Sequence, residues 1–322
     1  MDSARAFTVA DDGYFLGTVA LVNSLRITGN DLPVTVLDVG LRDWQRELLE
    51  AECEVTSPAE DVGLPQVSKA WAPARSDAEV VVLIDSDVIV TQPLHDVVAC
   101  ARAGFVHAYR DGPVADRWFV EWAEIFALRA PLRRQPYVNS GFLAFSPRHH
   151  PHLLARWTDA CARLRGRPVL AETVPDDPVW LVDQDALNAL LMSEWDASRL
   201  VQAPAPEMVL TGEMPAARVV DRRRLVCRTP AGPARMLHAV GTVKPWQPRA
   251  RWEYRSSVYT ACLTRLLLAD DVTIRVPAGA VPRRLHLGWG GWITARALQA
   301  YEAPARWTRP VRRRVGLSPL RG

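Results

Sequence analysis

The feature that most constrains the fold is a continuous apolar run at residues 80–84, Val-Val-Val-Leu-Ile, which ends directly in Asp85-Ser86-Asp87. Such an uninterrupted, β-branched run is typical of a strand that is buried on both faces of a sheet. Ligands of open α/β sheets bind at the carboxyl ends of the strands. The two carboxylates therefore emerge where a binding site is expected.

The first hundred residues alternate short apolar runs with amphipathic stretches, which indicates β-α-β units around a mostly parallel sheet. Strands are predicted at residues 7–10, 34–37, near 55, 80–84, 137–145 and 236–240. Helices are predicted at residues 14–28, 41–51, 94–103, 114–128, 151–164, 182–192 and 254–268. Residues 204–233 are a proline-rich region without an assigned element. No boundary between two independent domains is evident, and we expect one main domain at residues 1–270 with a C-terminal extension at 271–322.

Composition narrows the class of protein. Hydrophobic residues make up 48% and charged residues 23% of the chain, which is typical of soluble globular proteins. No apolar run approaches the ~18 to 20 residues of a membrane span, and the first residues lack the apolar core of a signal peptide, so we expect a cytoplasmic protein. The five cysteines are scattered and never spaced C-x-x-C, which predicts reduced core residues.

Charge is distributed unevenly along the chain. Residues 306–322 hold six arginines and no acidic residue, whereas the remainder is net acidic. A nucleic-acid partner is not expected, because such a partner requires positive charge on the folded domain. Two interpretations of the tail stay open. With Trp307 and the Trp-containing residues 288–292, the tail can settle on an anionic membrane surface, or it is a solvated end.

Two groups of polar residues are candidates for chemistry. Asp85 and Asp87 point the same way along an extended chain, so both can face one cation, although acidic pairs are also common on solvated loops. The second group is residues 238–246, His-Ala-Val-Gly-Thr-Val-Lys-Pro-Trp. There Gly241 permits close backbone approach, and Lys244 can place its charge against a phosphate. One imidazole with two carboxylates favours Mn²⁺ over Mg²⁺.

Lysine usage points to the same segment. Only Lys69 and Lys244 are lysines among 39 basic residues, which indicates a bias toward arginine. A lysine that persists against this bias is expected where a compact point charge is needed, and chance is the alternative.

Together these residues resemble glycosyltransferase family 8, a retaining group with the GT-A fold. The resemblance is carried, in the family's order, by Ala10-Asp11-Asp12-Gly13-Tyr14, Asp85-Ser86-Asp87, Asn139-Ser140-Gly141, Asp183-Gln184-Asp185 and the highly specific H-x-x-G-x-x-K-P-W pattern of residues 238–246. It implies a Rossmann-like, mixed and mostly parallel sheet flanked by helices, with a short helical and basic C-terminal tail. It also implies metal-dependent transfer of a hexose from a UDP-sugar, of the glucose or galactose type. The acceptor, whether glycan, lipid-linked or small molecule, is not identified.

The resemblance also implies roles for the matching residues. Asp85, Asp87 and His238 would bind Mn²⁺ or Mg²⁺, and Lys244 with the Gly241 backbone would grip the diphosphate. Asp11 would form a hydrogen bond with the uracil. The alternative interpretation is that Asp11 caps the N-terminus of a helix near Tyr14. The donor-binding set is Asp11, Tyr14, Lys69, Ser86, Asn139, Gly141, Gly241 and Lys244.

The implied catalytic pair is Asp183 and Gln184, which with Asn139 would contact the donor sugar. The alternative interpretations are a helix cap for Asp183, an exposed helical side chain for Gln184 and a turn residue for Asn139. Because an amide is a poor nucleophile at the anomeric carbon, we favour front-face attack by the acceptor while UDP leaves. Gly13 departs from relatives that carry a polar residue there, which leaves the donor preference open.

Two other functions stay open. A nucleotidyltransferase also presents carboxylates to a metal and a nucleotide, but such enzymes carry a glycine-rich basic loop where this chain has the acidic Ala10-Asp11-Asp12. The other alternative is a pseudoenzyme that binds a nucleotide-sugar as a scaffold without transferring the sugar. A measurement of turnover distinguishes it from a glycosyltransferase.

Overall fold

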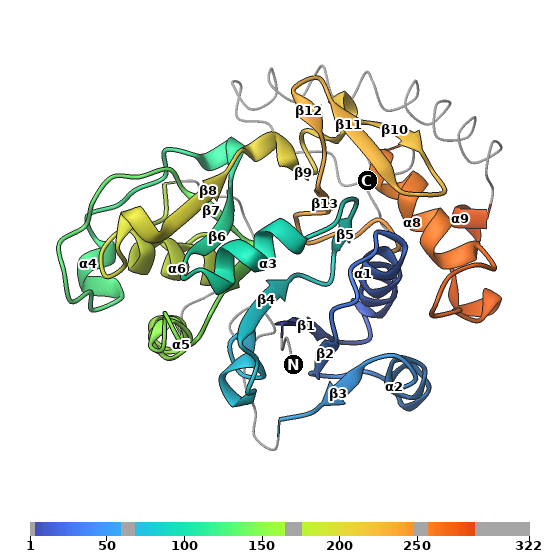
Figure 1. Ribbon diagram of the computed structural model, residues 1–322, viewed down its shortest axis with the longest axis horizontal. Helices are drawn as coiled ribbons and strands as arrows, with labels where there is room; N and C mark the ends of the chain where they lie inside the picture. The colour runs from blue at the N-terminus through green and yellow to red at the C-terminus, as the bar shows by residue number, and fades with distance from the viewer. Residues whose placement is uncertain (1–3, 59–67, 165–175, 248–256, 287–322) are drawn as a thin grey trace, which may run out of the picture.

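The apolar run predicted as a central strand is β4 (Val80–Ile84) in the computed structural model, which describes residues 4–58, 68–164, 176–247 and 257–286. β4 lies in the middle of a seven-stranded sheet (Figure 1). The spatial order is β3 (Glu54–Thr56), β2 (Val34–Asp38), β1 (Ala4–Ala10), β4, β7 (Val138–Phe145), β6 (Val106–Arg110) and β8 (Leu200–Ala203). β7 runs antiparallel to both its neighbours, and the other pairs are parallel. The predicted mixed, mostly parallel sheet is confirmed.

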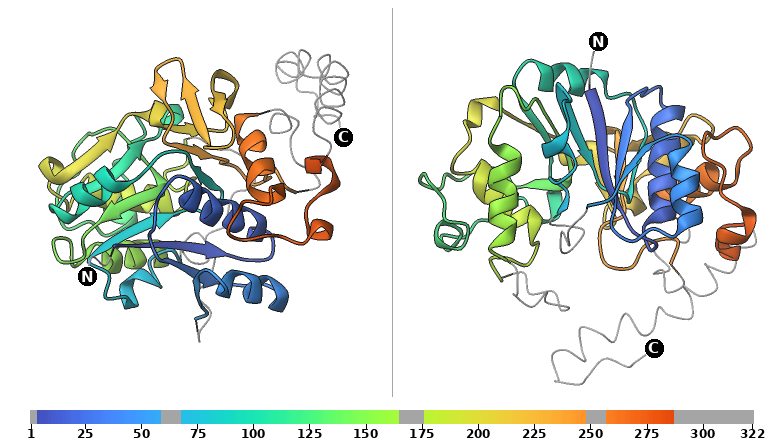
Figure 2. Two further views of the ribbon diagram at one scale, coloured as in Figure 1. Left: turned by 45° about the vertical axis from the view of Figure 1, so that its right-hand side comes forward. Right: turned by 90° about the horizontal axis from the view of Figure 1, so that it is seen from below.

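Helices cover both faces of the sheet (Figure 2). One face packs against α1 (Phe15–Ile27), which contacts α8 (Val258–Leu268), and the other packs against α5 (Leu153–Ala162) and α6 (Asp183–Leu191). The alternation along β4 shows the two cores: Val80, Val82 and Ile84 belong to the first, and Val81 and Leu83 to the second. Burial on both faces explains why this strand reads as an uninterrupted apolar run.

The remaining described helices are shorter. They are α2 (Asp43–Glu50), α3 (His95–Arg102), α4 (Trp122–Ile125), α9 (Arg283–His286) and the 3₁₀ turns Pro73–Arg75, Gly112–Val114, Ala197–Arg199, Ala205–Glu207, Met214–Ala216 and Ala278–Ala280. Among the described residues, no helix is long and apolar enough to cross a membrane.

Two small sheets come largely from the region that the sequence left without elements. β13 (Met236–His238) pairs antiparallel with β5 (Val88–Val90) and parallel with β9 (Met208–Leu210). A second sheet contains β10 (Arg218–Asp221), β11 (Val226–Thr229) and β12 (Gly232–Pro233). The proline-rich region at 204–233 therefore contains four short strands and two 3₁₀ turns. The strands are too short and too interrupted by turns to give a periodic signal.

The prediction of a helix at residues 114–128 is wrong for most of that range, because only Trp122–Ile125 is α-helical. Its apolar spacing arises because Trp122 and Phe126 are buried against the second core. The backbone of Ala127 has φ 46°, which no α-helix accepts, and the Arg117 side chain turns inward to Asp185. An irregular segment that packs inward can thus imitate helical periodicity.

The described part of the predicted C-terminal extension packs on the main body. Ile274 donates its amide to Asn23 Oδ1 on α1, and the Asn23 amide donates to the carbonyl oxygens of Leu266 and Ile274. Val276, Val281 and Leu285 belong to the same core as α1. The expected membrane contact at 306–322, Trp307 and residues 288–292 lie outside the described residues.

His107 on β6 should make stability sensitive to acid. It is buried against Tyr109 and Phe142, and burial, together with nearby Arg235, lowers its pKa to about 4. The unfolded chain binds this proton near pH ~6.5, so the stabilisation is complete above that pH and is lost as the pH falls toward 4. We expect protonation of His107 in the unfolded chain to lower the unfolding free energy by up to about 3 kcal/mol as the pH falls from ~6.5 to about 4.

The measurement is urea denaturation of the wild type and of His107→Gln at several pH values. Carboxylates titrate in both proteins, so the informative quantity is the difference between their unfolding free energies. That difference should shift in favour of the variant as the pH falls from 7 to 4. A difference that stays constant with pH would contradict the buried neutral histidine.

Candidate active site

The site forms where β4 ends and β13 is brought beside it. The Asp85 amide donates to the Gly141 carbonyl on β7 at 2.9 Å, and the Ala239 amide donates to the Asp87 carbonyl at 3.1 Å. The β5–β13 pairing sets His238 opposite Val88, next in the chain to Asp87. Residues more than 150 positions apart in sequence are thereby held in one place by backbone hydrogen bonds.

Asp85, Asp87 and His238 form a compact group. His238 Nε2 lies 3.1 Å from Asp87 Oδ1 and 3.8 Å from Asp85 Oδ2, and the three candidate ligand atoms lie within 4.8 Å of one another. Asp87 and His238 are each 4% exposed. Two carboxylate oxygens and one imidazole nitrogen are a donor set that divalent cations of the Mn²⁺ type accept. These residues therefore fit a divalent metal ion.

Asn139 orients the histidine. His238 Nδ1 is 3.1 Å from Asn139 Oδ1, which also accepts the Gly141 amide hydrogen at 2.9 Å. Because this oxygen can only accept, Nδ1 is the donor, and the ring is held with Nε2 toward the carboxylates. The residue predicted to contact the donor sugar thus also supports the candidate metal ligand.

Both lysines of the chain lie in this site, and each contacts one of the two candidate metal-binding aspartates, Asp85 and Asp87. Lys69 Nζ is 2.7 Å from Asp85 Oδ1 and 3.0 Å from Asp183 Oδ2, and Lys244 Nζ is 2.5 Å from Asp87 Oδ2. Each aspartate thus gives one oxygen to a lysine and turns the other toward His238. The lysines therefore orient the carboxylates, a role that the sequence did not suggest.

Charge balance in this group shifts the proton affinities. Burial opposes the charge of Lys69, but Asp183 and Asp85 more than offset it and raise the pKa of the ammonium group. Burial would also raise the pKa of Asp87, yet Lys244 and His238 outweigh it and hold the pKa of Asp87 well below its usual range. Lys69 stays cationic and Asp87 anionic at neutral pH.

Asp183 and Gln184 reach the site from the first turn of α6. Ser140 donates its hydroxyl to Asp183 Oδ2 at 3.0 Å and its amide to Gln184 Oε1 at 2.9 Å. Both side chains are buried rather than solvated, so the exposed-side-chain interpretation of Gln184 is wrong. Gln184 Nε2 donates to Asp111 Oδ2 at 3.0 Å, which fixes the orientation of its amide.

Asp111 is a site residue that the sequence did not reveal. Its Oδ2 accepts from both Gln184 and Asn139, at 3.0 and 2.9 Å, and the residue is 5% exposed. It directly follows β6, so it stands at a strand end like Asp85. Prediction of β6 would have identified it by the same argument.

A buried ion pair supports the start of α6. Arg117 donates from Nε and Nη2 to the two oxygens of Asp185, at 2.6 and 2.8 Å, and Tyr137 donates its hydroxyl to Asp185 Oδ1 at 2.8 Å. The Leu181 amide donates to the same carboxylate. Val182, between these anchors and Asp183, has φ 44°, a strained conformation for a β-branched residue.

The turn between β1 and α1 is tied to residues 238–246. Asp11 Oδ1 accepts from the amide of Tyr14, the residue that precedes α1, at 3.0 Å, and Trp246 Nε1 donates to the Gly13 carbonyl at 2.7 Å. Lys244 Nζ lies 5.2 Å from the Tyr14 ring centroid, and Trp246 meets the same ring edge-on. The predicted nucleotide side and phosphate side are thus adjacent.

The glycines of the motifs have different reasons to be glycine. Gly241 adopts φ +107°, but a Cβ there would meet no protein atom within 4 Å. At Gly141 a Cβ would lie 2.3 Å from His238 Cε1 and 2.8 Å from Asn139 Oδ1. At Gly17, beneath Ser86, it would lie 2.3 Å from the Ser86 carbonyl oxygen. Gly141 therefore makes room for the candidate ligand itself.

Gly141→Ala is expected to displace His238 and weaken Mn²⁺ binding by about 10- to 100-fold, because the added methyl group would overlap the imidazole. We also expect a loss of about 1 to 3 kcal/mol in unfolding free energy from overpacking. Calorimetric Mn²⁺ titration and urea denaturation measure the two effects. Gly279→Ala is the matched control, since a Cβ there meets nothing within 4 Å. Unchanged Mn²⁺ affinity in Gly141→Ala would contradict the assigned histidine position.

Comparison with solved structures identifies the fold. The galactosyltransferase LgtC, in complex with donor and acceptor sugar analogues, matches with a TM-score of 0.55 and 17% identity over 83% of this chain and 98% of that one. An active-site mutant of LgtC, in which a glutamine is replaced by glutamate, matches equally well over 85% of this chain. The bifunctional glycosyltransferase WbbM matches with a TM-score of 0.54 and 18% identity, over 84% of this chain and 50% of that one.

No family model matches the chain, and no curated protein matches its sequence. At these identities the structural likeness establishes the fold, which is that of GT-A glycosyltransferases. The fold expected from the resemblance to glycosyltransferase family 8 is confirmed.

Proposed function

We propose that this chain is a metal-dependent, retaining glycosyltransferase of family 8 type that transfers a hexose from a UDP-sugar. The observation that carries the proposal is the convergence of Asp85, Asp87 and His238 at the end of β4, with both lysines of the chain beside them. A GT-A sheet places this group where α/β folds bind their ligands. The solved neighbour LgtC, which binds donor and acceptor sugar analogues, has the same fold.

Asp85, Asp87 and His238 would hold Mn²⁺ or Mg²⁺, which when bound supplies positive charge against a diphosphate. Lys244 lies at the edge of this group and within contact of Tyr14, so its ammonium group can pass from Asp87 to a phosphate oxygen. Asp11, Ser86, Gly141 and the Gly241 backbone complete the proposed donor-binding set. Stabilising the departing diphosphate is the main electrostatic demand of such a transfer.

Asp183, Gln184, Asn139 and Lys69 are proposed to face the donor sugar. Gln184 uses both amide atoms in hydrogen bonds, to Ser140 and Asp111, which makes it a positioned polar contact rather than a nucleophile. This arrangement supports front-face attack by the acceptor, in which a leaving phosphate oxygen takes the acceptor proton. A trapped covalent glycosyl adduct on Gln184 would overturn that route.

The acceptor is proposed to be a sugar-bearing molecule, free or lipid-linked, and the 306–322 tail is proposed to contact an anionic membrane. If deletion of residues 306–322 left binding to anionic vesicles unchanged, the membrane contact would be rejected. The donor assignment would be unaffected by that result.

The test of donor binding is calorimetric titration with UDP-glucose and UDP-galactose in the presence of Mn²⁺ and, separately, of EDTA. We expect Mn²⁺-dependent binding, tighter for one of the two sugars. Absence of binding to any UDP-sugar with Mn²⁺ present would contradict the proposed function. Binding without turnover would favour the nucleotide-sugar scaffold.

A further inference from the structure

A basic hairpin stands apart from the candidate active site. The hairpin is formed by β10 and β11, and its residues 218–229 contain five exposed arginines and one acidic residue, Asp221. Asp221 is occupied within the hairpin, because its Oδ1 accepts the amide hydrogens of Arg223 and Arg224. With five arginines against one aspartate, the hairpin has a net positive charge.

Two of these arginines are placed against each other. Arg218 on β10 is the direct cross-strand partner of Arg228 on β11, and both are exposed. Like charges directly opposite in an antiparallel pair destabilise the pairing. This pair therefore adds to the positive charge of the hairpin without an acidic partner across the strands.

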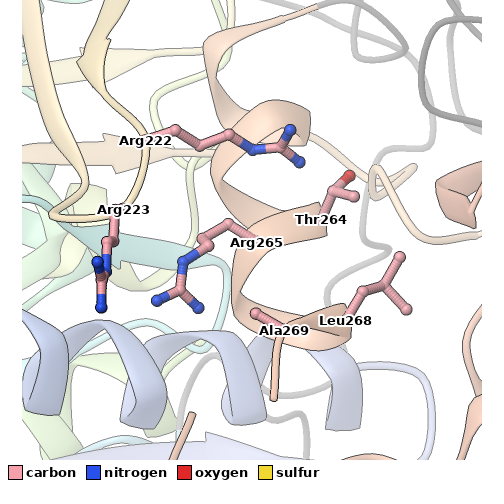
Figure 3. A pocket seen from close by; sticks show the side chains of 6 residues that line it. All are labelled: Arg222, Arg223, Thr264, Arg265, Leu268 and Ala269. Carbon is pink, nitrogen blue, oxygen red and sulfur yellow. The ribbon is translucent and has the colours of Figure 1, made fainter. Parts of the chain in front are cut away.

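A cavity of about 420 Å³ lies between the hairpin and α8. It is lined by Arg222, Arg223, Thr264, Arg265, Leu268 and Ala269 (Figure 3). Arg265 extends from α8 toward Arg223, so that their guanidinium groups lie near each other. Arg222 Nε donates to the Ala261 carbonyl at 3.2 Å, which holds the Arg222 side chain against the helix.

The cationic groups in this cavity exceed the acidic groups that contact them. Arg265 pairs with Asp271 at 2.9 Å, and Arg223 Nε is 4.0 Å from the same carboxylate, which is 55% exposed. The Arg265 side chain is only 10% exposed, and its Nη1 is buried without a hydrogen-bond partner among the described residues. Arg223 and Arg265 share the one Asp271 carboxylate, so the three guanidinium groups that line the cavity leave a net positive charge for an anion to balance.

We infer that the cavity between the β10–β11 hairpin and α8 binds a phosphate group through Arg222, Arg223 and Arg265. Guanidinium groups match the tetrahedral oxygens of phosphate with paired hydrogen bonds. Leu268 and Ala269 give the cavity an apolar wall, which suits a phosphate with an apolar substituent. The source of the phosphate is either a phospholipid headgroup or a soluble phosphorylated molecule. This site is independent of the proposed transferase function.

The test compares the wild type with Arg222→Gln/Arg223→Gln, in which both changes are at exposed positions. The matched control is Arg148→Gln/Arg163→Gln, which removes the same charge from exposed positions outside the hairpin. Inorganic phosphate is titrated by calorimetry at constant ionic strength in the presence of EDTA. We expect the hairpin variant to bind phosphate at least about tenfold more weakly than the wild type, and the control to bind as the wild type does.

Equal phosphate binding by the wild type and both variants would overturn the inference. A second arm identifies the source by sedimentation with phosphatidylglycerol vesicles and phosphatidylcholine vesicles. Weaker phosphatidylglycerol binding by the hairpin variant alone supports a lipid headgroup, and equal vesicle binding by all three proteins supports a soluble phosphate. UDP-sugar binding measured on the same proteins should be unchanged, so failure here is distinguishable from failure of the proposed function.

Discussion

Asp87→Asn is expected to lower metal-dependent turnover of the sugar donor by at least about a thousandfold. The substitution removes the anionic oxygen that faces His238 Nε2 at 3.1 Å, and with it one of the three candidate ligands. It also leaves the buried Lys244 ammonium without its carboxylate partner. The two losses act on the same proposed diphosphate-binding region, so metal affinity and turnover should fall together.

The measurement is the steady-state rate of UDP release at several Mn²⁺ concentrations. Asp96→Asn is the matched control, because that carboxylate pairs with Arg235 on the surface and has no role in the candidate site. If Asp87→Asn retained more than about a tenth of the wild-type rate at every Mn²⁺ concentration, Asp87 would not be a metal ligand.

Asp185→Ala is expected to lower the unfolding free energy by about 3 to 5 kcal/mol. Asp185 is fully buried and accepts from Arg117, Tyr137 and the Leu181 amide. Without it, the Arg117 guanidinium, whose side chain is 5% exposed, loses the carboxylate with which it pairs. Urea denaturation measures the loss.

The double variant Arg117→Met/Asp185→Leu distinguishes loss of the ion pair from lost packing. Replacing both members of a buried pair with apolar residues is often nearly neutral, so the double variant should recover much of the lost stability. A loss below about 1 kcal/mol in Asp185→Ala, or no recovery in the double variant, would contradict this account of the ion pair.

Prediction from the sequence succeeded where one strong local signal decides the structure. β4 shows its burial on both faces directly in its composition, and its end places Asp85 and Asp87. The spacing of His238 and Lys244 is specific enough to identify the second half of the candidate site. His238 and Lys244 both lie close to Asp85 and Asp87 in the structure. No sequence signal indicated that the two lysines of the chain pair with these carboxylates.

The sequence was uninformative where long-range packing decides. Asp111 is a single acidic residue after an unpredicted strand, and the two side chains that donate to its carboxylate are 28 and 73 residues away. Arg117 and Asp185 are 68 residues apart, so neither suggests the other. The segment around Trp122 satisfied helical spacing through burial alone, which is how the helix predicted at 114–128 arose.

The most direct test of the proposed function is UDP release from a panel of UDP-sugars by the wild type, with Mn²⁺ or with EDTA, in the absence of acceptor. Slow hydrolysis of the donor requires no knowledge of the acceptor. We predict release from one UDP-hexose that depends on Mn²⁺ and is abolished in Asp87→Asn. No release from any UDP-sugar, together with no Mn²⁺-dependent binding of one, would contradict the claim that this chain is a metal-dependent glycosyltransferase.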